Sequence, residues 1–561
     1  QKPRLFAHTP EEDLLAYGVP QEWLADVQQA TEDTLFDVVD HLPQEAAEAL
    51  LELATGGTPQ KTVALPGDTD PFSHPDAQRR FRVMGNVDEL KQALEYPWEK
   101  WTVFLHPSQR SLVERTCSGP TRVSGSAGTG KTIVGLHRAV FLARCHPQAQ
   151  VLLTTFSPAL ANALQVKLER LAGNEPATIE RITVASIQDV GRWLFNETFG
   201  LPVMAEDTAL RSQLVTIAER IAPSKFTEAF LWSEWQDVVD PWHLTTWDAY
   251  RDVPRLGRKT RLGGKQRELL WQIFEQLQGW LKQTGYLTWP QLFQHVIDHI
   301  DDTKDYPYTF AVVDEAQDMG VAELRFLAAL GRQRPDSLFF TGDLGQRIFQ
   351  QPFSWKALGI DIRGRSHTLT INYRTSHQIR TSADRLLPST ISDVDGNQDD
   401  RRHTVSVFNG PAPAVEIHDS PEDEMEFVGA WIAKRLSMGL QPDEIGVFVR
   451  DREQLERAIA AIQAAGADPV ELDDHIACAP GHIAVSTMHL AKGLEFRAVV
   501  VMACDDEVIP QQERIESIAD EADLDEVYIT ERHLLYVALT RARDDLLVSG
   551  VEPASEFLDD L

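Results

Sequence analysis

The chain has 561 residues, of which 43% are apolar and 25% charged, and its formal net charge is −32. This length exceeds what one hydrophobic core normally supports, so we expect several domains. The negative charge argues against a protein that coats nucleic acid by bulk electrostatics, although it does not exclude one that holds a strand in a local groove.

The cellular location follows from what the sequence lacks. No apolar run approaches the roughly 20 residues that a membrane helix needs, and the first residues do not read as a signal peptide. The four cysteines form no CxxC pair and no His/Cys cluster at zinc-ligand spacing, which argues for a reducing compartment. We therefore expect a cytoplasmic protein without a membrane partner.

Residues 1–95 are expected to form a helical accessory segment that ends in a linker. Apolar residues recur at helical spacing in EWLADVQQATEDTLFDVVDHL and PQEAAEALLELATGG, and the Pro/Gly/Asp-rich stretch PGDTDPFSHPD follows. The segment shows no catalytic motif, and contact with a protein partner is the role left open for it.

The rest of the chain predicts an α/β fold. Short β-like runs alternate with helical patterns over residues 96–190, which is typical of a parallel sheet. Long, Trp-rich helical patterns over 191–305 predict an all-helical insertion. Strand-like runs return over 306–365, and a second α/β series occupies 366–561. We expect two α/β domains with parallel sheets, the first one interrupted by the insertion.

The stretch GSAGTGKT lies between a strand-like run and an amphipathic helical pattern. In this context GxxxxGK[ST] is a P-loop, because glycines let backbone N–H groups surround phosphates at a helix N-terminus. The lysine would reach the β- and γ-phosphates, and the threonine hydroxyl would ligate Mg²⁺. The nucleotide-binding residues predicted here are Gly125, Ser126, Ala127, Gly128, Thr129, Gly130, Lys131 and Thr132.

The stretch TFAVVDEAQDMG, residues 309–320, places three carboxylates directly after an apolar run. Taken alone, it is explained equally well by an acidic surface turn. In a P-loop protein, however, a strand that ends in an acid holds Mg²⁺ and orients water against the γ-phosphate. We therefore assign Asp314 to the metal and Glu315 to the attacking water.

Six motifs surround the P-loop in a fixed order: HPSQR, DEAQD, TGDLGQRIF, LTINYRTS, STMHLAKGLEF and LLYVALTRAR. In order and spacing they resemble those of superfamily 1 helicases of the UvrD/Rep type, over about 450 residues from Phe104 to the C-terminus. The resemblance implies two RecA-like P-loop NTPase domains with ATP bound between them. Hydrolysis would drive a motor along single-stranded nucleic acid, most simply DNA.

The resemblance also implies roles for residues around the nucleotide. Gln109 and Tyr373 would contact the base, and Glu495 would contact the ribose. The phosphates would be contacted by Gln346, Arg374, Gly493 and Arg541. The expected catalytic set joins Gln346 and the two arginines to Lys131, Asp314 and Glu315.

Contacts with the nucleic-acid strand are expected in both domains, at Thr155, Phe156, Phe349, Phe353, Trp355 and His489. An unpaired base needs an aromatic or guanidinium face on which to stack. The family usually has a Tyr and a Trp after its GDxxQ motif, whereas this chain has Phe349 in place of the Tyr and a displaced Trp355, with Phe353 between them. Core packing is the alternative role for these aromatics.

Two further features bear on substrate handling. Only 114 residues lie between Arg374 and His489, and the second α/β pattern uses them. Relatives typically insert a mobile duplex-binding domain there, so the chain resembles a compact member without it. The basic window RDVPRLGRKTRLGGKQR, residues 251–267, is either a solvated loop or a phosphate-backbone contact.

Three functional hypotheses follow. The first is an ATP-dependent helicase that moves 3′→5′ on single-stranded DNA and acts at junctions with duplex, in repair, replication restart or defence. The second is a strand-stimulated ATPase or translocase that unwinds weakly and serves as a regulatory or recruiting subunit. The third is a nucleotide-dependent binding module without strand motion, which is disfavoured because a switch does not need both arginines and Glu315.

Overall fold

The computed structural model describes parts of residues 4–54 and, beyond them, residues 105, 107–253, 263–331, 334–343, 346, 353–396, 398–401, 403–472, 480–516 and 521–561. The chain divides into two compact units, Gln1–Pro97 and Trp98–Leu561. Within the described residues, no helix has both the length and the apolar character needed to cross a membrane.

The smaller unit contains the short helices α1 (Glu11–Ala16), α2 (Leu24–Gln29) and α3 (Leu35–Val39). Its apolar side chains, among them Phe6, Leu14 and Val27, pack into a core of their own. A small helical body is therefore present where the sequence predicts a helical accessory segment.

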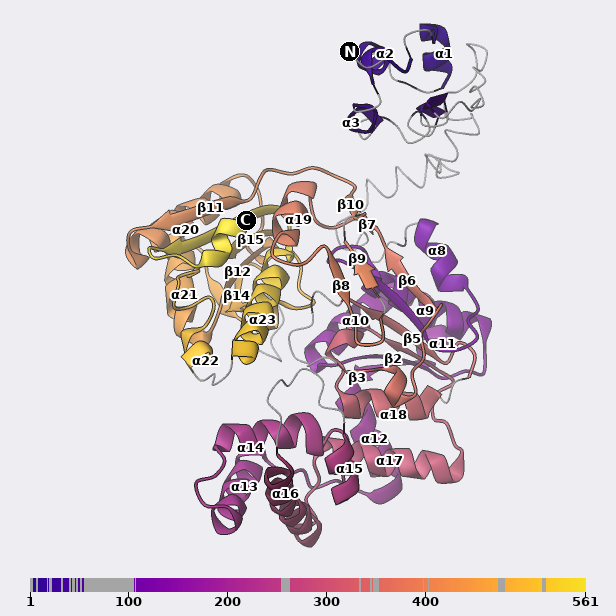
Figure 1. Cartoon of the computed structure of the whole chain (residues 1–561), viewed down its shortest axis with the longest axis vertical. Helices are drawn as coiled ribbons and strands as arrows, with labels where there is room; N and C mark the ends of the chain where they lie inside the picture. The colour runs from indigo at the N-terminus through magenta and orange to yellow at the C-terminus, as the bar shows by residue number, and fades with distance from the viewer. Residues whose placement is uncertain are drawn as a thin grey trace. The chain divides into compact units, whose positions relative to one another are not determined.

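Six parallel strands form the first sheet of the larger unit, in the order β3-β2-β4-β5-β1-β6 (Figure 1). They are β1 (Thr121–Gly125), β2 (Val151–Thr155), β3 (Ile182–Ser186), β4 (Phe310–Val313), β5 (Leu338–Gly342) and β6 (Ser366–Leu369). Successive side chains of a strand point to opposite faces, so Ala311 and Val313 join one core cluster while Phe310 and Val312 join another. Both faces of the sheet are thus buried, which explains its continuous apolar strands.

Helices flank this sheet and connect its strands: α8 (Pro107–Glu114), α9 (Lys131–Cys145), α10 (Pro158–Ala172), α11 (Pro176–Ile179) and α18 (Val321–Gly331), with the short helices η4 (Ala316–Asp318) and η6 (Lys356–Leu358). The glycine-rich loop leaves the carboxyl end of β1, and the acidic stretch leaves that of β4. Since β5 pairs with both strands, these loops open at one edge of the sheet, where α/β proteins bind ligands.

The insertion is helical and begins directly after β3. Its elements are α12 (Ile187–Phe199), α13 (Asp207–Ile221), α14 (Glu228–Glu234), η3 (Trp235–Val239), α15 (Trp247–Asp252), α16 (Gly264–Thr284) and α17 (Trp289–Thr303). Most of them build a separate core around Trp232, Trp235 and Trp271, to which the apolar face of α16 contributes.

Six further parallel strands form the second sheet, in the order β11-β16-β15-β12-β14-β13. They are β11 (Ala414–His418), β12 (Ile445–Val449), β13 (Pro469–Glu471), β14 (Ile483–Thr487), β15 (Phe496–Val501) and β16 (Ala542–Val551). The helical elements around them are α19 (His377–Asp384), α20 (Pro421–Ser437), α21 (Leu455–Ala464), α22 (Gln512–Glu516), α23 (Glu521–Leu539), η7 (Pro442–Glu444), η8 (Arg452–Gln454), η9 (Met488–Ala491) and η10 (Glu556–Asp560). The predicted α/β fold with two parallel sheets is confirmed.

The connection between the sheets differs from the sequence-based division at residue 366. Strand β6 begins at that residue but pairs with β1, at the edge of the first sheet. Residues Arg122 to Gly125 of β1 pair with Ser366 to Leu369 of β6. Strand β6 therefore lies beside the strand that precedes the glycine-rich loop, and it belongs to the first sheet. The chain then forms β7 (Ile371–Asn372), an antiparallel hairpin of β8 (Thr390–Ser392) and β9 (Gln398–Asp400), and β10 (Val405–Ser406), which pairs with β7.

The described residues between Arg374 and His489 are taken up by this hairpin, by β10 and by strands and helices of the second sheet. They contain no additional domain.

Candidate functional site

The glycine-rich loop turns from β1 into α9 through left-handed backbone at Gly128 (φ 81°) and Gly130 (φ 83°). Thr129 Oγ1 donates a hydrogen bond to the Ser126 carbonyl at 2.8 Å, and Lys131 Nζ donates to the same carbonyl at 3.0 Å. Burial lowers the pKa of Lys131, an effect that the carboxylate of Asp343 opposes. A buried amine at a helix N-terminus is a suitable partner for phosphate.

Two side chains from outside the loop fix its backbone. Gln109 on α8 donates from Nε2 to the Thr129 carbonyl at 2.8 Å, so this predicted base-reading residue lies against the loop itself. Asn372 on β7 donates from Nδ2 to the Ala127 carbonyl at 2.8 Å. A Cβ at Gly128 would lie 2.4 Å from Asn372 Oδ1, so glycine is required there for space as well as for its positive φ.

Asp314 lies at the carboxyl end of β4, beside the hydroxyls of two threonines. Thr341 Oγ1 donates to Asp314 Oδ1 at 2.5 Å, and the Thr132 side chain also hydrogen-bonds the carboxylate. Burial, and after it the charge of Glu315, raise the pKa of Asp314. A carboxylate beside a hydroxyl is the kind of hard oxygen pair that Mg²⁺ accepts when phosphates and waters complete its shell. Asp314 and Thr132 therefore fit the metal role assigned to them.

Glu315 follows in a left-handed backbone conformation, with φ at 54°. Gln317 Nε2 donates to its Oε2 at 2.5 Å, and Lys492 Nζ lies 3.8 Å from the same oxygen. Burial alone would raise the pKa of Glu315, but the positive charges of Lys492 and Lys131 outweigh it and the pKa is lowered. An ionised carboxylate held in this way can accept a hydrogen bond from a water molecule.

Gln346 connects the two sheets. It donates from Nε2 to Asp343 Oδ2 at 2.8 Å within its own domain. From the second domain, Arg541 Nη2 donates to Gln346 Oε1 at 3.0 Å, and Lys492 Nζ donates to the Gln346 carbonyl at 2.7 Å. A residue bonded in this way from both sides can transmit a change at the phosphates to the second domain.

Arg374 and Glu495 form a pair at the same junction, with Arg374 Nη2 2.5 Å from Glu495 Oε1. Lys167 of α10 lies 3.6 Å from that oxygen, so the first domain also contributes a cation. Burial raises the pKa of Glu495, but Arg374 and Lys167 outweigh it and the pKa is lowered. The phosphate-binding candidate Arg374 and the ribose-binding candidate Glu495 thus form an ion pair with each other.

The remaining nucleotide candidates also lie between the domains. Gly493 has φ at 78°, and a Cβ there would lie 2.0 Å from Leu160 Cδ2 on α10. The Tyr373 backbone N–H donates to the Gly128 carbonyl at 3.1 Å. The structure therefore brings every predicted nucleotide residue to the junction of the two sheets.

The nucleic-acid candidates of the first domain lie at the end of β2 and in the segments that follow β2 and β5. Thr155 is fully buried, whereas Phe156 is half-buried with its ring centroid 5.7 Å from Lys492 Nζ. Phe353 and Trp355 are half-buried and pack against the core, where Trp355 meets Phe340 edge-on at a centroid distance of 5.0 Å. Core packing thus accounts for part of each aromatic surface and leaves part accessible.

Two candidates remain. His489 lies on η9 of the second domain, and its burial, together with the charge of Arg450, lowers its pKa to about 4. It is therefore neutral at physiological pH and can contact a strand through hydrogen bonds rather than charge. Phe349 and the central part of the basic window, residues 254–262, lie outside the described residues.

Sequence reasoning missed three residues that complete this site: Thr341, Asp343 and Lys492. Lys492 Nζ is buried and also binds a carboxylate oxygen of Asp318 across the domain junction. Thr341 and Asp343 stand inside the quoted motif TGDLGQRIF and Lys492 inside STMHLAKGLEF, so the signal was present. Their roles depend, however, on partners that the sequence does not reveal.

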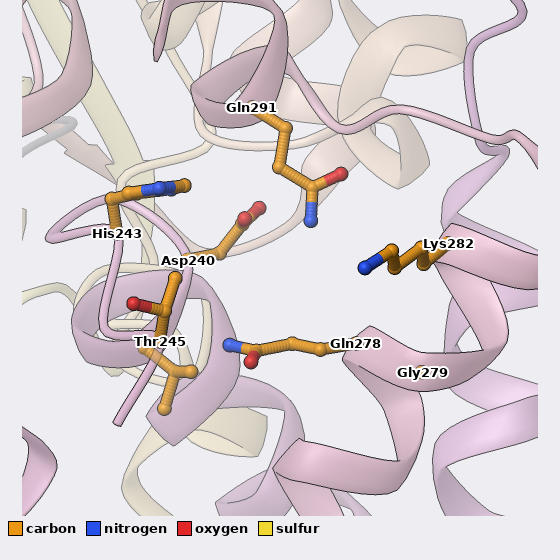
Figure 2. Close-up of a pocket in the computed structure, with 8 residues that line it drawn as sticks. Asp240, His243, Thr245, Gln278, Gly279, Lys282 and Gln291 are labelled. Carbon is orange, nitrogen blue, oxygen red and sulfur yellow. The ribbon is translucent and has the colours of Figure 1, made fainter. Parts of the chain in front are cut away.

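A separate cavity of about 320 Å³ lies in the helical insertion, between η3, α16 and α17 (Figure 2). Asp240, Lys282 and Gln291 point toward its centre. Asp240 accepts a hydrogen bond from Thr288 Oγ1 at 2.8 Å, and its burial raises its pKa to about 7. None of the predicted site residues lines this cavity.

Comparison with known proteins matches both halves of the larger unit. Residues 105–353 match the UvrD/REP helicase N-terminal domain, and residues 469–552 match the UvrD-like helicase C-terminal domain. The chain is 22% identical over 553 residues to the ATP-dependent DNA helicase UvrD2 of Mycobacterium tuberculosis, an alignment that covers 77% of this chain and 76% of that one. It is 25% identical over 492 residues to DNA helicase IV of Escherichia coli K12, with 78% and 67% covered.

Proposed function

Because this chain belongs to the UvrD/REP family of ATP-dependent DNA helicases, we propose that it moves 3′→5′ along single-stranded DNA and separates duplex at junctions. The observation that carries the proposal is the network around Gln346, in which Arg541 and Lys492 of one domain bind the residue that also holds Asp343 of the other. The direction of movement rests on the motif resemblance alone.

ATP binding would use groups from both domains. Lys131 and the loop amides would bind the phosphates, and Arg374 and Arg541 would add positive charge from the second domain during phosphoryl transfer. Magnesium, held by Thr132 and Asp314, would neutralise phosphate charge. Glu315 would orient the attacking water, since its neighbouring cations keep it ionised.

Movement requires that the two domains hold DNA differently in the two nucleotide states. Phe156 offers a partly exposed ring beside Lys492, which itself binds Asp318 and the carbonyl of Gln346. A change at the phosphates would therefore reach a residue that borders the expected groove. Phe353 and Trp355 offer further partly exposed rings on which bases could stack.

A second function is favoured by the compact second domain. The described residues between Arg374 and His489 form no separate duplex-binding domain, so a DNA-stimulated translocase that unwinds weakly fits the same site. Such a protein would act as a regulatory or recruiting subunit, and its N-terminal unit would bind the partner. Repair, replication restart and defence are the processes in which either activity is useful.

Two measurements separate these functions. ATP turnover by the full chain should rise when single-stranded DNA is added, and turnover that ignores DNA would overturn both. Strand displacement is then compared on duplexes with a 3′ or a 5′ single-stranded tail. Displacement from the 3′ tail alone supports the helicase with the proposed direction, whereas stimulated turnover without displacement supports the translocase.

A further inference from the structure

Arg401 lies in the connection between the two sheets, directly after β9, and belongs to none of the six motifs. Its side chain is only 5% exposed. The hairpin that precedes it is fastened to β1, since Arg122 Nη1 lies 3.1 Å from Asp393 Oδ2 and Arg122 Nη2 lies 2.8 Å from Asp399 Oδ2. The hairpin therefore places Arg401 relative to the strand that carries the P-loop.

The Arg401 guanidinium contacts a tyrosine that touches the P-loop. Its Nη2 donates to the Tyr536 hydroxyl, and its central carbon lies 4.5 Å from the centroid of the Tyr536 ring. The same hydroxyl accepts a hydrogen bond from the Ala127 backbone N–H at 3.4 Å. Arg401 is thus one side chain removed from an amide predicted to face phosphate.

Arg401 also shares a carboxylate with the P-loop lysine. Asp343 Oδ2 lies 4.0 Å from Arg401 Nη2 and 3.9 Å from Lys131 Nζ. A buried carboxylate between two cations divides its attraction between them, and interactions at this distance are strong where water is excluded. Without Arg401, Lys131 would lose a cation that competes with it for Asp343, and this carboxylate would hold the amine more strongly away from the phosphates.

Stability alone is a poor explanation for this arrangement. A buried guanidinium is costly unless its donors are satisfied. Within the described part of the chain, Nε and Nη1 of Arg401 have no hydrogen-bond partner. Asp384 Oδ1 lies 3.4 Å from Nη2 and adds charge compensation but leaves those two nitrogens unsatisfied. An arginine retained in such surroundings is better explained by a role in the site.

We propose that Arg401 is a positioning residue of the ATP site, which shares the Asp343 carboxylate with Lys131 and holds the Tyr536 hydroxyl on the P-loop, so that Lys131 stays available to the phosphates. The inference rests on the proposed ATPase function and adds to it a residue that lies outside the recognised motifs. It predicts that Arg401 acts on nucleotide affinity rather than on the chemical step.

The test compares Arg401→Met and Arg401→Lys with the wild-type full chain. Binding of a fluorescent ATP analogue is measured by titration, and KM for ATP and kcat are measured with saturating single-stranded DNA. Arg401→Met should weaken binding and raise KM by about tenfold while kcat changes by less than about twofold, because ground-state positioning of Lys131 is lost. Arg401→Lys keeps the positive charge, so its nucleotide affinity should lie between those of the wild type and Arg401→Met.

A rescue and a control make the result specific. Asp343→Asn removes the charge that would capture Lys131. Adding Arg401→Met to Asp343→Asn should therefore weaken nucleotide binding much less than Arg401→Met weakens it in the wild-type protein. Arg457→Met is the control, because the Arg457 side chain is 11% exposed, pairs with Glu424 and Asp505 in the second domain and lies outside the site.

Three results would overturn the proposal: unchanged binding in Arg401→Met, no recovery in the double variant, or an equal loss in Arg457→Met. Binding of the analogue is measured without hydrolysis. A wild-type protein that binds ATP but fails the DNA-stimulation experiment would therefore contradict the proposed motor function and leave this test intact.

Discussion

Glu315 in the candidate ATP site and Asp240 in the helical insertion are both buried carboxylates, and their pKa values are shifted in opposite directions. At the end of β4, Glu315 is surrounded by Lys492, Lys131 and Arg541, and its pKa is lowered although the site is buried. In the helical insertion, burial raises the pKa of Asp240 to about 7. Among the described residues, only the hydrogen bond from the Thr288 hydroxyl opposes this rise. Burial therefore does not determine the charge of an acid, because the neighbouring cations decide it.

The comparison also separates two kinds of polar site. The cations around Glu315 come from both domains, so its charge depends on how the domains meet. Asp240 directly follows η3, and its hydrogen-bond partner Thr288 precedes α17, so both residues belong to the insertion. The first site can respond to domain movement, whereas the second reports the local stability of the insertion.

The largest effect is expected from Glu315→Gln, which removes the charge that the cations maintain. ATP turnover should fall on the order of 10³-fold, because a glutamine does not orient and polarise the attacking water as a carboxylate does. Binding of a fluorescent ATP analogue should stay within a few-fold of wild type. Loss of binding instead of turnover would show that Glu315 serves the nucleotide or the metal and not the water.

Lys492→Met tests the cations themselves. Lys492 lowers the pKa of Glu315 and joins the domains through Asp318 and Gln346, so DNA-stimulated turnover should fall by about 10²-fold. Since the folded-state pKa of Glu315 rises when this cation is removed, the acidic limb of the residual pH–rate profile should move to higher pH. A profile with an unmoved limb would remove Lys492 from the electrostatics of Glu315.

Asp240→Asn tests the opposite case. The folded-state pKa of about 7 exceeds the ordinary value of 3.8, so neutral Asp240 supports stability below pH 3.8 and this support is lost as the pH rises through 7. The asparagine should stabilise the insertion by up to roughly 4 kcal/mol above pH 7.5, and by less at pH 6. Hydrogen exchange of α16 and α17 at the two pH values measures the difference, and a gain that does not grow with pH would contradict the assignment.

The smallest effect is expected from Thr288→Val. It removes the hydroxyl that donates to Asp240 and that also accepts from the Gln291 backbone N–H at the start of α17. The insertion should lose about 1–2 kcal/mol, the value of a buried hydrogen bond and a helix cap. Thr288→Ser keeps the hydroxyl and should stay near wild type in the same exchange experiment, and an equal loss in both variants would point to packing.

The sequence predicted the fold for identifiable reasons, and the same local signals identify the residues proposed for the ATP site. The turn at Gly128 needs a positive φ, and the strand before Asp314 is apolar because both faces of its sheet are covered. Such requirements act within a few residues and leave a local pattern. The division at residue 366 was less accurate, because β6 belongs to the first sheet through pairing with a strand far away in the sequence.

What the sequence by itself determined is therefore the set of chemical groups and their order along the chain: the P-loop, the acids after β4 and the arginines of the later motifs. Tertiary structure alone decided which charged groups interact with one another. Lys492 reaches Glu315, and Arg401 and Lys131 flank Asp343, only because the loops after β1, β4 and β5 of the first sheet meet segments that lie far away in the sequence. The physical reason is that electrostatic interactions depend on separation in space and on excluded water, and neither is written in the local pattern of residues.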